Sequence, residues 1–271
     1  MRLPLFIAYR YLFSKKKVNA INIITGIAML GFGVGAFAMI VVLSTFNGFE
    51  NLVEGMINNY DPEIRITAKA KKTFVYTSEL ESKISAIEGV NRVSEVLEEK
   101  VVVKYDEHQE IGKIKGVSEN YNTGKFDSLI VIGNFNLGDS SGYFGVFGGG
   151  LSGKLNLFPG TTEPVTVFVP RRDVEYNSLN PMASLSTEYL RASGIFLVKE
   201  EVDDEVFITS LDFAQKLLSY PDQITALELG LKPEMNIDDV KEKLKEVLGE
   251  GYEVKTRKEL NELIYKIFSS E

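Results

Sequence analysis

The chain of 271 residues contains no cysteine and a single histidine, His108. The lack of cysteine excludes disulfide frameworks, thiolate catalysis and cysteine-ligated zinc or iron–sulfur sites. One histidine cannot supply a pair of histidine ligands, and His108 falls in an expected turn, where a solvated side chain suffices. We therefore expect no metal and no cofactor.

Basic residues are few outside the N-terminus. The chain has 30 Lys and Arg against 38 Asp and Glu, a net charge of −8, and five of the basic residues lie in residues 1–17, which hold no acid. The acidic remainder has no basic stripe and repels phosphate backbones, which argues against nucleic acid as a partner. The asymmetry indicates a membrane instead.

No charged side chain occurs in residues 18–49. A helix of this length exceeds the ~30 Å hydrocarbon core, which needs only ~20 residues, so it must emerge from the bilayer. Cations precede this segment, while Glu50 and Glu54 follow it. The positive-inside rule predicts a cytoplasmic N-terminus and a main domain on the outer side of the membrane.

A cleaved signal peptide is the alternative for this segment. Ala36, Phe37 and Ala38 resemble a signal cleavage site. However, the apolar run continues through residues 39–43, whereas the apolar part of a signal spans only ~7–15 residues and stops before the cleavage site. We expect the segment to stay as a transmembrane helix.

Small residues recur along this helix at spacings of three, four and three: Ala28, Gly31, Gly35 and Ala38. In lipid, such a seam allows a second helix to approach closely. Residues 3–13 carry apolar and aromatic side chains beside Arg2 and Arg10, so residues 1–17 suit a short helix lying at the cytoplasmic interface.

Apolar residues continue beyond the bilayer at helical spacing until Pro62 ends the helix: Phe46, Phe49, Val53, Met56 and Tyr60. Residues 18–60 therefore form a transmembrane helix with a stalk. The stalk packs either against a partner helix or against the chain's own domain, and the spacing does not decide between them.

The rest of the chain predicts an α+β domain. Residues 61–117 contain a strand at 64–67, a helix at 79–87 capped by Ser78, strands at 101–105 and 111–117, and a turn at 106–109. Residues 204–256 repeat this β-α-β rhythm, with helices that start at Ser210 and Asn236. We interpret these parts as two halves of one α+β subdomain with an insertion between them, followed by a final helix at 257–271.

Residues 118–203 form an inserted, mainly β subdomain. Its Gly148-Gly149-Gly150 run lacks the Gly-Lys-Ser/Thr of a phosphate loop, and a turn before a short helix at 151–157 explains the run. No pair of carboxylates stands out from the acidic surface. An anchored periplasmic enzyme, which needs a convergent polar cleft, is therefore disfavoured.

A long β-hairpin is expected at 165–198 within the insertion, with strands at 165–169 and 190–198. Its centre places Leu179 and Met182 beside the Asn180-Pro181 turn, and Arg171, Arg172 and Arg191 add positive charge. A basic and apolar arm suits an acidic or apolar partner, while a mobile loop is the alternative.

Several segments together resemble the LolC/LolE type of lipoprotein-releasing permease, within the MacB-like exporter superfamily: 6–12, 42–50, 167–170, 180–182 and 206–218. The resemblance implies an inner-membrane protein whose periplasmic main domain has a porter-like part, 61–117 and 204–256, and an insertion. It further implies that 257–271 is a stalk helix leading to the second membrane helix, that three further membrane helices follow the first, and that the ATPase is a separate protein. It also implies that the arm around Pro181 is a hook for the lipoprotein chaperone LolA. Met39, Leu43 and Phe46 would line the cavity that receives lipoprotein acyl chains.

We therefore expect a non-enzymatic permease fragment that pairs with a second permease subunit, either a different protein or a copy of itself. It contacts membrane lipid and passes lipoproteins from the inner membrane to a chaperone. The alternative is a mechanotransmission subunit, similar to MacB or FtsX, which binds a periplasmic adaptor or hydrolase and moves no lipid.

Overall fold

The computed structural model describes residues 20–121, 124–171 and 184–262, and the single positions 3, 6, 7, 10, 265 and 266. Most of the interfacial helix expected at 1–17, the centre of the hairpin and the end of the final helix lie outside these residues. The chain divides into two units, Met1–Val53 and Glu54–Glu271.

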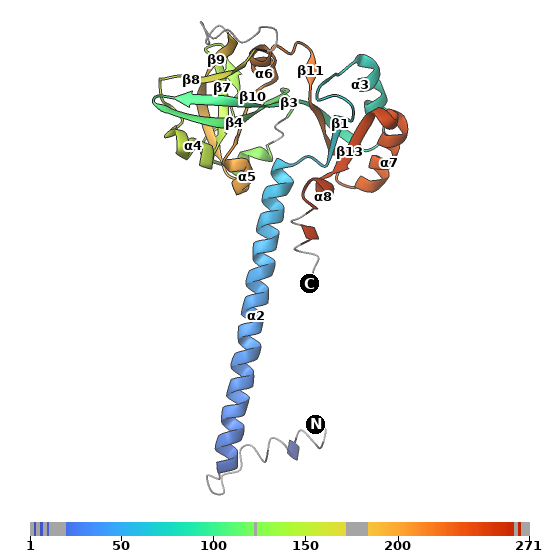
Figure 1. The fold of residues 1–271 in the computed structure, drawn as a ribbon. Coiled ribbons are helices and arrows are strands. Elements are labelled where there is room, and N and C mark those ends of the chain that lie inside the picture. Colours follow the sequence, from blue (N-terminus) through green and yellow to red (C-terminus); the bar gives the residue numbers. More distant parts are fainter. Residues whose placement is uncertain are drawn as a thin grey trace. The chain divides into compact units, whose positions relative to one another are not determined.

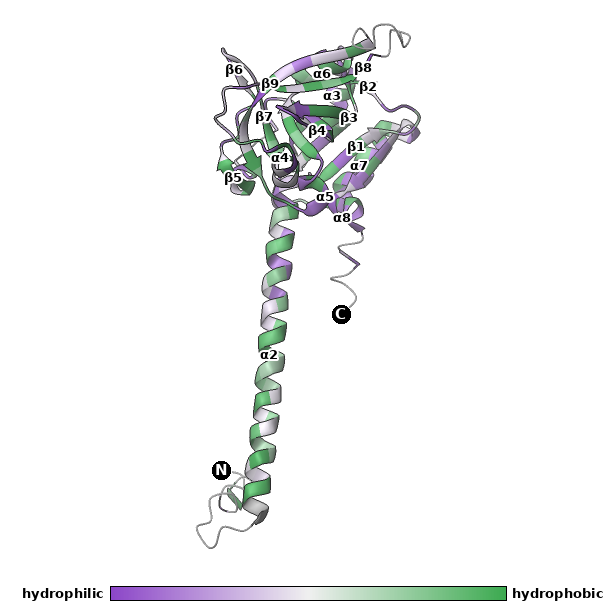
Figure 2. Ribbon diagram, turned by 60° about the vertical axis from the view of Figure 1, so that its left-hand side comes forward, coloured by the Kyte–Doolittle hydropathy of each residue, from purple (hydrophilic) through white to green (hydrophobic). Residues whose placement is uncertain are grey.

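The helix α2 (Ala20–Tyr60) has 41 residues (Figure 1). It contains no proline, and it ends two residues before Pro62, which explains its length. Ile23–Tyr60 is long and apolar enough to cross a membrane, and Figure 2 shows its predominantly apolar residues. Large side chains in the first unit, such as Phe32, are exposed.

The porter-like part contains four antiparallel strands in the order β13-β1-β12-β3. Its helices α3 and α7 contact each other and share a core with the sheet. The strands of the two segments β1-α3-β3 and β12-α7-β13 alternate in this sheet. The bounds are β1 Ile64–Ala68, β2 Phe74–Val75, α3 Ser78–Ser85, β3 Val90–Tyr105, β4 His108–Val117, β11 Gln223–Ile224, β12 Ala226–Leu231, α7 Ile237–Leu248, η3 Gly249–Gly251, β13 Tyr252–Thr256 and α8 Arg257–Leu260.

The remaining elements, together with β3 and β4, build a barrel. Its strands form a closed cycle, β3-β4-β10-β7-β9-β8, in which β8 returns to pair with β3. Its core contains Phe147, Val167 and Phe207, and the helices α4 and α6 add Leu151 and Phe213. The bounds are η1 Phe126–Leu129, β5 Ile130–Gly133, β6 Gly138–Asp139, β7 Gly142–Gly148, α4 Gly149–Leu155, β8 Val165–Pro170, β9 Leu185–Phe196, α5 Glu200–Asp203, β10 Val206–Ser210 and α6 Leu211–Leu218.

Strand β3 joins the two parts. Its 16 residues pair with β12 through Val90–Val96 and with β8 through Val102–Lys104, while β4 lies along its other edge. The sequence predicts only residues 101–105 as strand, because polar side chains interrupt the first half. That half becomes a strand through its pairing with β12, which is distant in sequence.

Several element ends differ from the sequence-based expectation. Helix α3 is capped by Thr77 rather than Ser78, and its Oγ1 accepts from the backbone N of Leu80. The turn after β3 comprises only residues 106 and 107. Asp106 takes a positive φ of 51°, and His108, the first residue of β4, already pairs with Tyr105, the last residue of β3.

The glycine run serves close packing. Helix α4 begins at Gly149, two residues earlier than expected, and ends at Leu155. A Cβ at Gly148 would collide with the backbone of Asp203, and one at Gly150 would collide with Asp204. The glycines therefore allow α4 to approach the end of α5, and they need no phosphate to explain them.

Candidate functional site

The three residues expected to line a lipoprotein cavity lie at spacings of four and three on α2. Met39 and Leu43 are exposed and Phe46 is half-buried. The small-residue seam is also open: a Cβ at Gly31 or Gly35 would meet nothing within 4 Å. Within the described part of the chain, the seam at Gly31 and Gly35 and the side chains of Met39 and Leu43 are therefore open, whereas Phe46 is partly covered.

The arm begins as expected, with β8 and β9 paired antiparallel from Val165↔Leu190 to Pro170↔Leu185. Arg191 is exposed on β9, and the backbone N of Arg171 donates to Ser184 O at 2.8 Å. The other predicted contact residues lie outside the described residues: Arg172, Leu179, Asn180, Pro181 and Met182.

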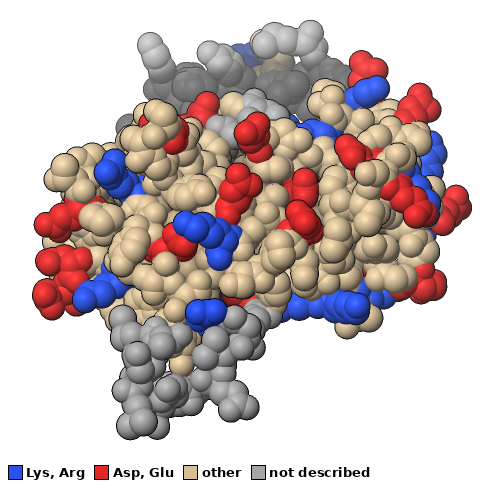
Figure 3. Space-filling view, turned by 90° about the horizontal axis from the view of Figure 1, so that it is seen from above, with Lys and Arg blue, Asp and Glu red and all other residues tan. Residues whose placement is uncertain are grey.

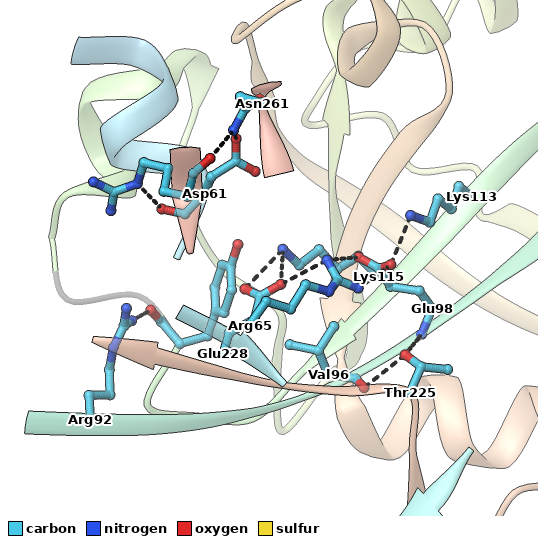
Figure 4. A network of polar contacts seen from close by, with 12 residues as sticks. Asp61, Arg65, Arg92, Val96, Glu98, Lys113, Lys115, Thr225, Glu228 and Asn261 are labelled. Carbon is cyan, nitrogen blue, oxygen red and sulfur yellow. Dashed lines mark hydrogen bonds and ion pairs between the residues drawn. The ribbon is translucent and has the colours of Figure 1, made fainter. Parts of the chain in front are cut away.

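The structure contains a buried charge network that the sequence analysis missed (Figure 4). Lys115 on β4 and Glu228 on β12 are 1% and 2% exposed, and Lys115 Nζ lies 3.0 Å from Glu228 Oε1. Burial disfavours the charged ammonium, but the attraction of Glu228 outweighs it and holds the pKa of Lys115 above its ordinary value. Lys115 therefore keeps its charge in this buried position.

Three further residues extend the network across the sheet. Arg65 Nη2 lies 2.7 Å from Glu98 Oε2, Arg65 Nη1 lies 3.3 Å from Glu228 Oε1, and Lys113 Nζ lies 2.8 Å from Glu98 Oε2. Burial alone would raise the pKa of Glu98, but Arg65 and the two lysines hold it well below its usual range. Every carboxylate of the network is thus paired.

Strand geometry explains why these charges meet. Side chains alternate between the two faces of a strand, so Ile114 and Leu97 enter the core of the barrel while Lys115 and Glu98 face the opposite side. Tyr60 at the end of α2 and Tyr121 cover that side, and Lys115 Nζ lies 4.9 Å from both ring centroids. The last turn of α2 therefore helps to shield the charge network from solvent.

A second polar cluster lies beside the first, at the point where α2 ends and α8 begins. Arg257 Nη1 donates to Asn58 Oδ1 at 2.7 Å, and Asn261 Nδ2 donates to Asp61 Oδ2 at 2.8 Å. A cavity of about 30 Å³ lies between the two clusters, lined by residues that include Tyr60, Tyr121, Glu228 and Arg257. This volume has room for water but not for an organic substrate.

The chemistry of the site is that of a structural junction. Its cations and carboxylates neutralise one another, and among the described residues no group of three His, Asp or Glu side chains could hold a metal ion. On the face seen from above in Figure 3, Lys and Arg are interspersed with Asp and Glu, without a basic stripe. This face is unsuited to a nucleic-acid backbone.

A family model for the MacB-like periplasmic core domain matches residues 25–247. Two similar curated relatives are the lipoprotein-releasing system transmembrane proteins LolC of Buchnera aphidicola subsp. Schizaphis graminum, 24% identical over 88% of this chain, and LolE of Haemophilus influenzae, 25% identical over 85% of this chain. The chain spans 58% and 55% of the length of these relatives.

The fold is similar to the crystal structure of the periplasmic region of MacB from Actinobacillus actinomycetemcomitans, with a TM-score of 0.50 and 11% identity over 81% of this chain and 97% of that one. The α+β fold expected from the sequence is confirmed, as is the resemblance to LolC and LolE. Because the family model covers most of its length, the chain belongs to the family of proteins with a MacB-like periplasmic core domain.

Proposed function

We propose that the chain is the N-terminal part of a permease subunit of an ABC exporter that releases lipoproteins from the inner membrane. The observation that carries the proposal is the match to LolC and LolE, which extends over 88% and 85% of the chain. The helix α2 spans the membrane, its N-terminus is cytoplasmic and the α+β domain is periplasmic.

In this function the chain makes and breaks no covalent bond. A separate ATPase subunit supplies the energy, and a second permease subunit packs along the seam of Ala28, Gly31, Gly35 and Ala38. The open face of α2 at Met39, Leu43 and Phe46 contacts the acyl chains of the cargo. The arm that begins with the paired strands β8 and β9 holds a LolA-like chaperone, with Arg171 at the described end of its first strand and Arg191 at its base.

Crosslinking from the cavity face tests this function. A photoreactive amino acid replaces Phe46 in the full-length protein, assembled with its partners in lipoprotein-containing membranes. Phe37 is the matched control, because nine residues of α-helix turn it about 180° away from Phe46. We expect lipoprotein adducts from position 46 and at most background from position 37.

The same crosslinks distinguish the alternative function. Adducts to a periplasmic adaptor or hydrolase, without lipoprotein adducts at either position, would replace lipoprotein release with mechanotransmission. Equal lipoprotein labelling from both positions would show that lipoproteins only surround the helix, and would remove the cavity from the proposal.

A further inference from the structure

Arg257 connects the exit segment of the domain, residues 257–261 with α8, to the end of α2. Its Nη1 donates to Asn58 Oδ1 at 2.7 Å and its Nε donates to the carbonyl oxygen of Asp61 at 3.0 Å. Its Nη2 also lies 3.3 Å from Glu63 Oε1, and its side chain is 12% exposed. One guanidinium thus contacts three consecutive parts of the chain that enters the domain, a geometry that a lysine cannot reproduce.

Asn261 connects the insertion, through Lys199, to the same end of α2. Its Nδ2 donates to Asp61 Oδ2 at 2.8 Å, while its Oδ1 accepts from Lys199 Nζ at 2.9 Å. Lys199 is the N-cap residue of α5, and Asn261 is 6% exposed. The amide is both donor and acceptor here, so neither a carboxylate nor an apolar side chain can replace it.

The insertion also contacts the end of α2 directly. The ring of Tyr60 lies 6.2 Å from the rings of both Phe126 and Phe196, and all three belong to one buried aromatic core. Asn59 Nδ2 donates to Ser128 Oγ at 2.9 Å on η1. The barrel therefore reaches α2 without relying on the porter-like part.

We propose that Arg257 and Asn261 form a clamp that makes the last turn of α2, the exit segment around α8 and the barrel one mechanical body, and that this clamp stays closed throughout the transport cycle. The consequence for transport rests on the proposed function: displacement of α2 is passed to the barrel, and so to the β8–β9 arm, instead of being absorbed at a hinge. The paired and buried polar groups support a closed clamp, because opening it would leave Arg257 and Asp61 without their partners.

Hydrogen exchange on the full-length transporter in membranes tests the clamp without reference to cargo. In the wild type, we expect the backbone amides of α8, of the last turn of α2 and of α5 to keep the same protection with and without a bound ATP analogue. In Asn261→Asp, which places a carboxylate beside Asp61, exchange in all three segments should rise together by about 10-fold. The control is Lys258→Ala, an exposed position on α8 where no change is expected.

Two results would overturn the clamp. One is a rise confined to α8 in Asn261→Asp; the other is a loss of protection on nucleotide binding in the wild type, which would identify a hinge. Transport is measured separately: Asn261→Asp should reduce lipoprotein release at least about 10-fold while ATP hydrolysis stays within about 3-fold. A wild type that releases no lipoprotein would refute the proposed function, while the exchange data would still decide on the clamp.

Discussion

The side chain of Lys115 shows how much one buried charge depends on its partners. Replacing Lys115 with methionine keeps the length of the side chain but leaves Glu228 with Arg65 as its remaining cation, at 3.3 Å. Removing one partner of a buried ion pair costs roughly 3–5 kcal/mol, so we expect the free energy of unfolding to fall by about 3 kcal/mol. Denaturant unfolding of the purified chain in detergent measures this change.

The matched control for Lys115→Met is Lys113→Met on the same strand. Lys113 is 37% exposed and pairs with Glu98 at 2.8 Å. Its loss should cost less than about 1 kcal/mol, because Arg65 still pairs with the Glu98 carboxylate at 2.7 Å and a partly exposed ammonium contributes little. Equal losses from the two variants would contradict the role of burial.

The pH dependence of stability follows from the same network. The pKa of Glu98 is lowered on folding, so its contribution is present above its unfolded pKa of ~4.3 and is lost as the pH falls below that value. The pKa of Lys115 is raised, so its contribution persists until the pH rises above ~10.4. We therefore expect a stability plateau between these values in thermal unfolding scans.

A variant and a control assign the acid limb of that profile. Glu98→Gln should lower the plateau and reduce the slope below about pH 4, because the amide binds no proton. Glu250→Gln removes a fully exposed carboxylate and should leave the profile unchanged. If Glu98→Gln kept the slope of the wild type, other carboxylates would control acid unfolding.

The network escaped sequence reasoning because each of its charges has an ordinary local pattern. In β4, Lys113 and Lys115 alternate with apolar neighbours and look like a solvated strand face. Glu228 is a lone acid between two leucines, and Arg65 is a lone base between two isoleucines. Opposite charges at the centres of separate apolar strands were the available signal, but their meeting depends on a strand order that local patterns do not contain.

Local chemistry predicted the helices of the domain better than its strands. Ser210 and Asn236 cap α6 and α7 as expected, since their side chains accept from backbone N–H groups at the helix starts. The first half of β3 was missed, and β9 begins at Leu185 instead of residue 190. Caps are recognised within one turn of chain, whereas a strand is defined by distant partners.

The arm built on β8 and β9 supports a prediction for chaperone binding. Arg191 is exposed on β9, and we expect its positive charge to attract acidic groups of the partner. The charge reversal Arg191→Glu should therefore weaken capture of a LolA-like chaperone about 10-fold. Pull-down with the purified chaperone measures capture. Lys243→Glu, an exposed reversal on α7, makes the same change in net charge and should have no effect.

The topology of the whole domain could be anticipated only in part. The β-α-β rhythm on either side of an insertion is visible in the sequence, and the strands of these two β-α-β segments alternate in one sheet. The closed strand cycle is not visible, because it depends on the pairing of Val102 with Phe168 across a long sequence separation. No local pattern reports such a pairing, and yet it makes β3 common to both parts of the domain.

Assembly with a second permease is the remaining test at the scale of the complete transporter. A Cβ at Gly31 or Gly35 meets nothing within 4 Å among the described residues, and leucine favours the helix more than glycine does. Gly31→Leu/Gly35→Leu should therefore preserve the fold but reduce copurification of the partner permease about 10-fold, by filling the seam along which the helices approach. Gly33→Leu is the control, because it lies about 200° around the helix from either glycine and is equally open. Loss of the partner in Gly33→Leu alone would move the helix interface to the other face of α2.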